Sequence, residues 1–353
     1  MAQHPSSSDA LRTELNELLE ILPQLKHKEL IQQALQTLVQ LAEVEADRLD
    51  WKILNSSLVD MGGAFRIFYP YRHVRKVSIF GSARVEPTTQ SYQMAVEFAE
   101  QVTRMGFMVM TGAGGGIMQA GNQGAGVESS FGLNIQLPFE QGSNPFIEGD
   151  RKLINFKYFF TRKLFFLRES DALVLFPGGF GTQDEAFECL TLMQTGKSDL
   201  VPLVLVEPPG SDYWQSWQDY IKAHLLSQRL INESDLSLFT ITDRVDEACE
   251  AIASFYRVYH SSRYVDENMV IRLNSELSDA DVEQLNEQYS DILVTGTIRK
   301  STALPRESSA EIEHLPRLVL HFNQRDLGRL YQMIRLINKL GMAQAQVMHP
   351  EQK

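Results

Sequence analysis

The residues best suited to chemistry form one short stretch, FPGGFGTQDE, from Phe176 to Glu185. A glycine-rich turn that runs into a helix can bind phosphate, because free backbone N–H groups and the helix dipole both favour an anion. We predict this role for Gly179, Gly181 and Thr182, with the helix beginning near Thr182. Glu185 then lies in the first turn, about as far from the phosphate as a nucleotide's ribose.

The same stretch also has a purely structural interpretation. An acidic residue in the first turn stabilises a helix through its dipole, and we favour that role for Asp184. Glu188 follows Glu185 by about one turn, on the same side of the helix. Glu185 is the carboxylate that we expect to face the sugar.

A second glycine cluster, TGAGGGIM, runs from Thr111 to Met118 and also leads into a helical stretch. Such glycines can serve tight turns alone, but two clusters on one sheet edge favour phosphate binding, here at Gly115 and Gly116. The dinucleotide pattern GxGxxG is absent from both clusters, and neither ends in the GK[ST] of a P-loop. The pattern therefore predicts phosphate binding without the signatures of NAD or ATP.

A run of positive charge lies between the two clusters. Residues 151–168 contain no acidic residue, and the segment can be either a solvated basic helix face or part of the ligand edge. Since it leads directly into FPGGFGT, we favour the ligand edge. Its cations are Arg151, Lys152, Lys157, Arg162, Lys163 and Arg168.

A carboxylate and a cation beside a phosphate clamp meet the needs of N-glycosidic bond cleavage. Positive charge develops on the sugar in the transition state, and a fixed carboxylate stabilises it. The reaction also needs an activated water or a proton for the departing base. The residues alone do not decide which group transfers the proton.

The surrounding pattern predicts the elements that hold these residues. Short apolar runs of strand length alternate with helical stretches, which indicates a parallel sheet covered by helices on both faces. In such a sheet ligands bind at the carboxyl ends of the strands. We predict strands at 77–80, 108–111, 132–137, 172–176 and 201–206, and helices at 91–105, 117–126, 153–169 and 182–195.

The regions that flank this alternation have other patterns. Residues 1–70 carry two amphipathic helices, around residues 11–22 and 30–42, suited to covering a domain surface or a subunit interface. Residues 264–353 read as strand, helix, strand, strand, helix, with a polar segment at 299–316 typical of a mobile loop. We expect a Rossmann-like domain at 71–263 and a small regulatory or oligomeric α+β appendage after it.

Composition narrows the classes of partner. The formal charge of -12 opposes binding to nucleic acid or an anionic membrane. The 2 cysteines form no cluster, so we predict no metal site and no disulfide framework. No signal peptide or membrane span is evident, and we expect a soluble, cytoplasmic protein. The basic and aromatic run at 65–76 can alternatively stack on nucleic-acid bases, but we favour a lead-in to the first strand.

The motifs resemble those of the lysine-decarboxylase-like proteins, which are nucleoside 5′-monophosphate phosphoribohydrolases and include the cytokinin-activating Lonely Guy enzymes. PGGFGTQDE is similar to the PGGxGTxxE signature, and Arg162-Lys163 is similar to the family's second motif. FGSAR and TGAGGGIMQAGNQGA resemble its first two glycine loops. The resemblance covers roughly residues 70 to 260.

This resemblance implies a Rossmann-like fold, a homodimer or higher homo-oligomer, and catalysis without a cofactor by Arg162 and Glu185. It implies hydrolysis of a nucleoside 5′-monophosphate, AMP or an N6-substituted AMP, to free base and ribose 5-phosphate. No site argues for the pyridoxal cofactor of a decarboxylase. The alternative is a non-catalytic sensor of nucleotides that uses the same cleft. Further substrate contacts are predicted at Ser82, Met118, Lys163 and Glu188.

Overall fold

The computed structural model describes residues 13, 16–17, 26–44, 46–137, 142–305, 307 and 312–348. The chain divides into two compact units, Met1–Gly62 and Gly63–Lys353. In the first unit, α2 (Lys28–Glu43) confirms the helix predicted around residues 30–42. The helix predicted around 11–22 lies almost wholly outside the described residues. A further helix, α3 (Arg48–Phe68), which the sequence analysis did not predict, leads into the second unit.

The centre of the second unit is a seven-stranded sheet with the order β4-β3-β2-β1-β5-β6-β7, in which every pairing is parallel. Four of its strands, β2, β1, β5 and β6, are buried throughout, as expected for strands with helices on both faces. This confirms the predicted doubly wound α/β fold. The strands are β1 (Lys76–Phe80), β2 (Met108–Thr111), β3 (Ser130–Ile135), β4 (Leu153–Phe156), β5 (Ala172–Leu175), β6 (Leu203–Val206) and β7 (Phe239–Thr242).

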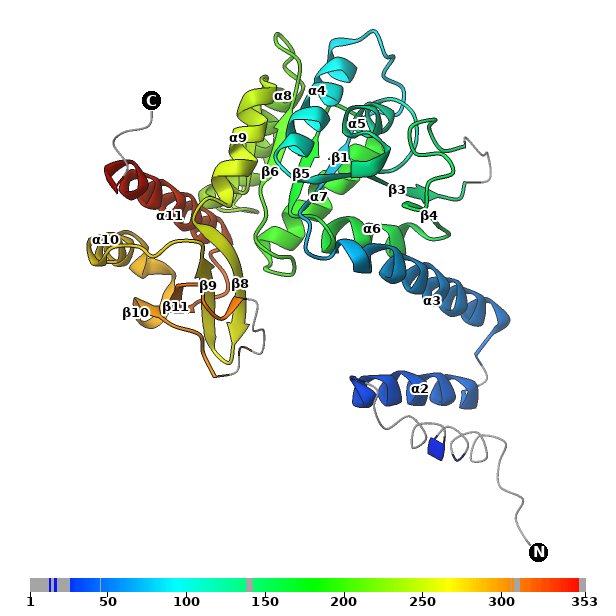
Figure 1. Ribbon diagram of the computed structural model, residues 1–353, viewed down its shortest axis with the longest axis horizontal. Helices are drawn as coiled ribbons and strands as arrows, with labels where there is room; N and C mark the ends of the chain where they lie inside the picture. Colours follow the sequence, from blue (N-terminus) through cyan, green and yellow to red (C-terminus); the bar gives the residue numbers. More distant parts are fainter. Residues whose placement is uncertain are drawn as a thin grey trace, which may run out of the picture. The chain divides into compact units, whose positions relative to one another are not determined.

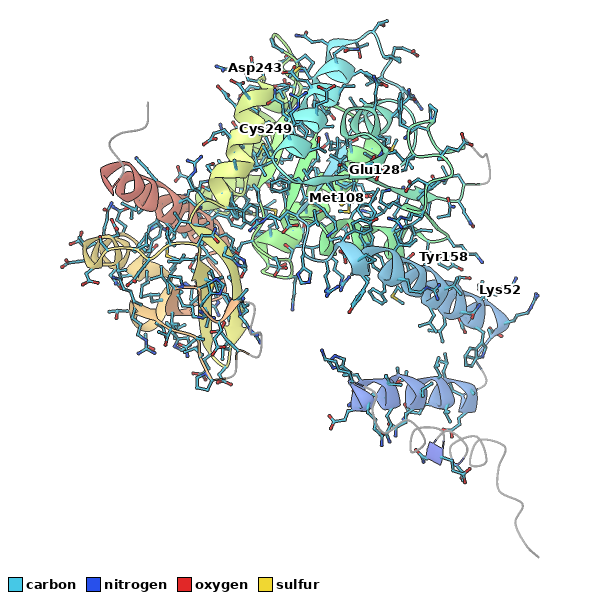
Figure 2. All side chains as sticks on the ribbon, in the orientation of Figure 1. Lys52, Met108, Glu128, Tyr158, Asp243 and Cys249 are labelled. Carbon is cyan, nitrogen blue, oxygen red and sulfur yellow. The ribbon has the colours of Figure 1, made fainter. Side chains whose placement is uncertain are left out.

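Helices cover both faces of this sheet and make three layers (Figure 1). One face packs against α4 (Gln90–Arg104), α5 (Ile117–Ala125) and α9 (Val245–Phe255) in a continuous apolar core. Cys249 on α9 belongs to this core, and Figure 2 labels it. The other face carries α6 (Phe159–Arg168), whose Phe166 meets Phe80 of β1 at 4.8 Å between ring centroids.

Shorter elements complete this part of the chain. After β6 come α8 (Tyr213–Tyr220), the π-helical η3 (Ile221–Leu226) and the 3-10 turn η4 (Glu233–Leu238). Two further 3-10 turns, η1 (Tyr69–Tyr71) and η2 (Val127–Ser129), precede β1 and β3. Within the described residues, no helix combines the length and the apolar character needed to cross a membrane.

Two local predictions in this domain are wrong. The helix predicted over 153–169 is divided, because residues 153–156 form the edge strand β4, in which Ile154 and Phe156 are buried and Asn155 is exposed. Helix α6 begins only at Phe159, after Tyr158 in an extended conformation. The helix predicted to start near Thr182 is α7 (Phe180–Gln194), which begins two residues earlier with Gly179 as its N-cap.

A second sheet, antiparallel with the order β10-β11-β9-β8, forms the predicted C-terminal α+β addition. Its first strand, β8 (Tyr259–Val265), was not predicted and begins before residue 264. Glu307, within the segment predicted to be mobile, is held by Arg272 and Arg317 at 2.7 and 2.8 Å. The other elements are β9 (Asn268–Leu273), α10 (Asp279–Tyr289), η5 (Ser290–Ile292), β10 (Leu293–Ser301), β11 (Arg317–Phe322) and α11 (Leu327–Met348).

Helix α11 returns from this addition to the parallel sheet, and Asn338 fixes it there. The Asn338 carboxamide oxygen accepts hydrogen bonds from the backbone N–H groups of Val258 and Tyr259 at 2.8 and 3.0 Å. Its amide nitrogen donates to the carbonyls of Phe255 and Ile334 at 2.8 and 2.9 Å. One buried side chain therefore satisfies the backbone where α9 gives way to β8.

We expect Asn338→Ala to lower the free energy of unfolding by about 2–4 kcal/mol, because it leaves several buried backbone groups without a partner. Chemical denaturation measures this change. Gln288→Ala, an exposed substitution on α10, is the control and should change stability by less than about 0.5 kcal/mol. Equal stability of the two variants would contradict the anchoring role of Asn338.

Candidate functional site

The strand order reverses between β1 and β5, and a cleft of about 870 Å³ opens at the carboxyl ends of the strands there. This is where ligands bind in doubly wound sheets, because the loops after the two strands leave in opposite directions. The described residues that line the cleft come from the ends of β1 and β3, from the loops that follow β1, β2, β3 and β5, and from α5, α6 and α7. They are Phe80–Arg84, Gly112, Met118, Ile135, Leu137, Phe159, Arg162, Phe166 and Gly178–Glu185.

The backbone of Ser82 ties three of these loops together. Its N–H donates to the carbonyl of Pro177 at 3.1 Å, and its carbonyl accepts from the N–H of Ile117 at 3.0 Å. The first bond joins the loop after β1 to the glycine turn after β5, and the second joins it to the first residue of α5. The two predicted glycine turns therefore form one structure.

Close contacts within this structure require several of the glycines. Gly116 has a φ of 61°, and a Cβ there would lie 2.2 Å from the carbonyl oxygen of Ser82. A Cβ on Gly178 would lie 2.1 Å from Oγ1 of Thr182. A Cβ on Gly179 or Gly181 would meet no atom within 4 Å. Packing thus explains Gly116 and Gly178, whereas Gly179 and Gly181 leave open space at the cleft.

The open space lies at the start of α7. No side chain caps this helix, and no acidic residue lies in its first turn. The first N–H groups of a helix have no acceptor within the helix, so those of Phe180, Gly181 and Thr182 are available to an anion. Because α7 begins at Phe180, Glu185 lies in the second turn, roughly 7.5 Å along the axis from the helix start.

Residues that the sequence analysis did not identify support the glycine turn after β5. Tyr213 of α8 donates from its hydroxyl to the carbonyl of Gly178 at 2.5 Å, and it accepts from the side-chain amide of Gln183 at 2.6 Å. Tyr213 comes from a segment more than 30 positions later, without a recognisable motif. Its bonds hold the turn against the body of the domain.

A buried polar network supports the glycine turn after β2. The carboxamide oxygen of Asn122 accepts from Oγ1 of Thr111 at 2.7 Å and from the amide of Asn144 at 2.9 Å. The same Asn144 amide donates to the carbonyl of Gly114 at 3.0 Å. Asn144 belongs to the loop after β3. This later loop therefore holds the glycine turn after β2 in position.

Glu185 is the buried acid of the site. Its residue exposure is 5%, and its Oε2 atom has no hydrogen-bond partner among the described residues. Burial raises the pKa of Glu185 to about 7, although the neighbouring cations Lys163 and Arg162 act in the opposite direction. A carboxyl group with this pKa exchanges a proton readily near neutral pH.

Lys163 is shared by three carboxylates of α7. Its Nζ lies 2.7 Å from Asp184, 2.5 Å from Glu188 and 3.7 Å from Glu185. Burial alone would lower the pKa of Lys163, but the bonds to Asp184 and Glu188 raise it above its ordinary value. Lys163 is thus closest to the two outer acids, and Glu185 receives only its more distant attraction.

Arg162 brings a second cation to the cleft. Its guanidinium carbon lies 5.0 Å from the centroid of the Phe159 ring and 5.7 Å from that of Phe166. Its Nε is buried without a hydrogen-bond partner among the described residues. Burial lowers the pKa of Arg162, and the charges of Glu185 and Asp184 counteract that effect. The guanidinium still has donors to offer a ligand.

The structure brings seven of the eleven predicted site residues to the cleft. The four that are not among its lining residues are Gly115, Gly116, Lys163 and Glu188. Arg84 and Phe159 line the cleft, and the sequence analysis had assigned them no role. No group of three or more metal-ligating side chains is found among the described residues. The seven that line it are Ser82, Met118, Arg162, Gly179, Gly181, Thr182 and Glu185.

Comparison with known protein families tests the resemblance to the lysine-decarboxylase-like proteins that the motifs indicated. Residues 88–252 match the family model described as "Possible lysine decarboxylase". This region is therefore similar to that family. The match includes both glycine turns, α6 and α7, and it confirms the resemblance predicted from the motifs. None of the curated proteins matches the chain.

Several solved structures are similar to about half of the chain. A structural-genomics target designated TM1055 has 22% identity and a TM-score of 0.37, over 51% of this chain and 98% of its own. A molybdenum cofactor binding protein from Rippkaea orientalis has 19% identity and a TM-score of 0.36, over 51% and 96%. DNA processing protein A from Helicobacter pylori has 12% identity and a TM-score of 0.36, over 52% and 82%.

The raised pKa of Glu185 predicts a pH-dependent stability. The unfolded chain ionises Glu185 near 4.5, whereas the folded protein does so near 7. Its stabilising contribution is therefore complete below pH 4.5 and is lost as the pH rises through 7. We expect Glu185→Gln to raise the free energy of unfolding at pH 8 by up to about 3 kcal/mol and to leave it nearly unchanged at pH 4.

Chemical denaturation at both pH values measures this difference. Glu188→Gln is the matched control, because it removes a half-buried carboxylate that also contacts Lys163. It should bring no comparable gain at pH 8. A Glu185→Gln variant that is less stable than the wild type at pH 8 would show that the carboxylate is not under strain from burial.

Proposed function

We propose that the protein hydrolyses the N-glycosidic bond of a nucleoside 5′-monophosphate, AMP or an N6-substituted AMP, to free base and ribose 5-phosphate. The observation that carries the proposal is the pairing of Glu185 with the start of α7. A buried acid whose pKa is raised to about 7 lines the same cleft as an uncapped helix start that two glycines leave open. The family match over residues 88–252 supports a nucleotide-related enzyme.

The phosphate is assigned to the start of α7. The N–H groups of Phe180, Gly181 and Thr182 and the dipole of a 15-residue helix favour a dianion there. Gly179 and Gly181 let its oxygens approach the backbone. Arg84, which is exposed at the cleft, adds a positive charge. Gly115 and Gly116, in the glycine turn after β2, remain predicted phosphate contacts.

Glu185 is assigned to the sugar. Its distance along α7 from the helix start is close to the span between a 5′-phosphate and the ribose hydroxyls. As a carboxylate it stabilises the positive charge that develops as the bond to the base breaks, and it orients the attacking water. The positive charge that develops on the sugar in the transition state offsets the cost of keeping Glu185 ionised in a buried position.

Arg162 is assigned to the departing base, which leaves with developing negative charge unless it is protonated. A guanidinium held between Phe159 and Phe166 offers donors without taking up a proton itself. Phe180, which is 97% exposed beside the same cleft, is the candidate to stack on the base. Ser82 and Met118 complete the predicted contacts, and Lys163 with Glu188 positions α6 against α7.

Homo-oligomerisation and a cytoplasmic location are retained as parts of this proposal. The first rests on the resemblance and on the amphipathic N-terminal sequence. The second rests on cysteine usage, since Cys189 and Cys249 are both free and buried. Size-exclusion chromatography with light scattering determines the number of subunits.

We expect Glu185→Ala to lower the rate of base release from AMP or N6-isopentenyl-AMP by at least about 100-fold, because it removes the group that stabilises the oxocarbenium-like state. Chromatography of the released base measures the rate, and calorimetry measures nucleotide affinity, which should change by less than about ten-fold. Glu100→Gln, on the surface of α4, is the control with unchanged activity. Full activity of Glu185→Ala would remove Glu185 from the mechanism.

The sensor alternative gives a different result in the same assay. A sensor would release no base from any nucleoside monophosphate in a panel, while nucleotides would still raise the melting temperature of the wild-type protein. That outcome would overturn the hydrolase proposal and retain the cleft as a nucleotide site.

The glycines provide an independent test of the phosphate position. Gly181→Ala adds a methyl group where no protein atom lies within 4 Å, so the fold should keep or slightly gain stability. We expect the affinity for AMP to fall at least ten-fold, because the methyl group occupies the space assigned to phosphate.

Gly63→Ala is the matched control, because Gly63 lies in helix α3 and also has no atom within 4 Å of an added Cβ. It should leave the affinity for AMP unchanged. Calorimetric titration measures both variants. If Gly181→Ala binds AMP as the wild type does, phosphate does not sit against the first turn of α7.

A further inference from the structure

A second pocket lies at the opposite edge of the parallel sheet, where β6 and β7 begin. Its volume is about 340 Å³, which is within the range of pockets that hold small organic molecules. Its walls come from the starts of β6 and β7, from the end of α9 and from α11. Because α11 belongs to the C-terminal addition, the pocket exists only where that addition returns to the sheet.

The walls of this pocket are largely apolar. Leu203, Val204 and Leu238 lie on the side of the sheet, and Phe255 contributes an aromatic surface from α9. Tyr331 presents its ring, since its hydroxyl is already bound to the backbone of Val201 at 3.0 and 3.1 Å. An occupant therefore needs an apolar or aromatic body.

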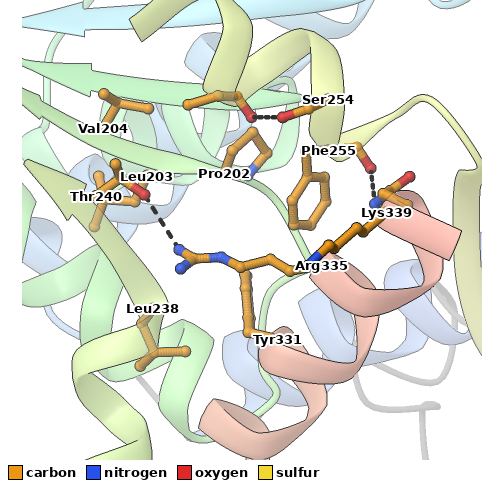
Figure 3. Close-up of a pocket in the computed structure, with 12 residues that line it drawn as sticks. Pro202, Leu203, Val204, Leu238, Thr240, Ser254, Phe255, Tyr331, Arg335 and Lys339 are labelled. Carbon is orange, nitrogen blue, oxygen red and sulfur yellow. Dashed lines mark hydrogen bonds between the residues drawn. The ribbon is translucent and has the colours of Figure 1, made fainter. Parts of the chain in front are cut away.

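The available polar groups of the pocket are cationic. Arg335 and Lys339 are one helical turn apart on α11, and the residues that line the pocket include no aspartate or glutamate. Figure 3 shows Arg335 extending across the pocket toward Thr240, and its Nη2 lies 3.2 Å from the Thr240 hydroxyl and 3.5 Å from the carbonyl of Phe239. No ion pair joins Arg335 or Lys339 to a carboxylate in the part of the chain that the structure describes.

Other polar side chains in the pocket have less to offer. The carboxamide of Asn338 uses both of its atoms in four hydrogen bonds to backbone groups. The Ser254 hydroxyl donates to the carbonyl of Ala251 at 3.3 Å. The unpaired charges of Arg335 and Lys339 thus determine which ligand chemistry the pocket selects.

We propose that this pocket binds a small organic anion, with an apolar or aromatic body of one or two rings and a carboxylate, phosphate or sulfonate group. The body would contact Leu203, Leu238 and Phe255, and the anionic group would lie between Arg335 and Lys339. A planar guanidinium binds such a group through two parallel hydrogen bonds, and the ammonium adds a point charge. The site is separate from the cleft at the carboxyl ends of the strands.

The probe for this proposal is 8-anilinonaphthalene-1-sulfonate, an aromatic anion whose fluorescence rises in an apolar environment. We expect saturable binding to the full-length protein. The double variant Arg335→Gln and Lys339→Gln should weaken that binding at least ten-fold, and Ser254→Phe, which fills the pocket without changing its charge, should weaken it as well. Both cations are exposed, so their replacement leaves the fold intact.

The charge-matched control is Lys222→Gln combined with Arg325→Gln, two exposed cations away from the pocket. It should bind the probe with the wild-type affinity, and thermal melting verifies that every variant is folded. Two results would overturn the proposal: wild-type protein without saturable binding below about 1 mM probe, or a folded Arg335 and Lys339 variant that binds as tightly as the control.

Discussion

The cleft depends on one topological constraint, the reversal of strand order between β1 and β5. Chains leaving two adjacent parallel strands in opposite directions cannot fill the space between their first turns. The backbone of Ser82 spans that space and bonds to Pro177 on one side and Ile117 on the other. Main-chain atoms make these bonds, so the backbones of the three loops must approach one another closely. This is why Gly116 and Gly178 must lack side chains.

The arrangement of loops around the strand-order reversal also determines how the charges around α7 are placed. Three acids on one helix share Lys163, and the two that reach solvent, Asp184 and Glu188, are nearest to its ammonium. Glu185 faces inward, where burial outweighs the attraction of Lys163 and Arg162, and its pKa rises to about 7. The uncapped start of the helix and its buried acid are therefore compatible, since the N–H groups at the start are open to the cleft and Glu185 is sheltered from water.

The sequence predicted five of the seven strands of the parallel sheet, because a continuous apolar run of about four residues allows few alternatives. It did not predict β7, in which threonines alternate with apolar residues. Leu153–Phe156 was misassigned because an edge strand alternates buried and exposed residues, and four such residues next to a helix resemble an additional helical turn. The start of α7 was misplaced because Thr182 is a common N-cap, whereas the actual N-cap is Gly179, which contributes no side-chain bond.

The residues of the candidate site also include some that the sequence predicted and some that it did not. Those within one local motif, such as Gly181 and Glu185, could be found from spacing alone. Tyr213, Asn122 and Asn144 could not, because they act through hydrogen bonds to residues 11 to 35 positions away, and no local pattern encodes such pairings. The predicted substrate contact of Lys163 stays a prediction; in the structure its ammonium group is bonded to the acids of α7.

The C-terminal addition is integrated into the domain through α11. Tyr331 bonds to Val201, two residues before β6, and Gln332 donates to Ser237 in η4. Asp235 of the same turn accepts from Gln194, the last residue of α7. The helix that carries Arg335 is thus connected to the helix that carries Glu185 by two hydrogen bonds, one on each side of η4. An anion that neutralised Arg335 and Lys339 would act on α11 at the side chains next to these contacts, so the pocket lies where the addition can affect the end of α7.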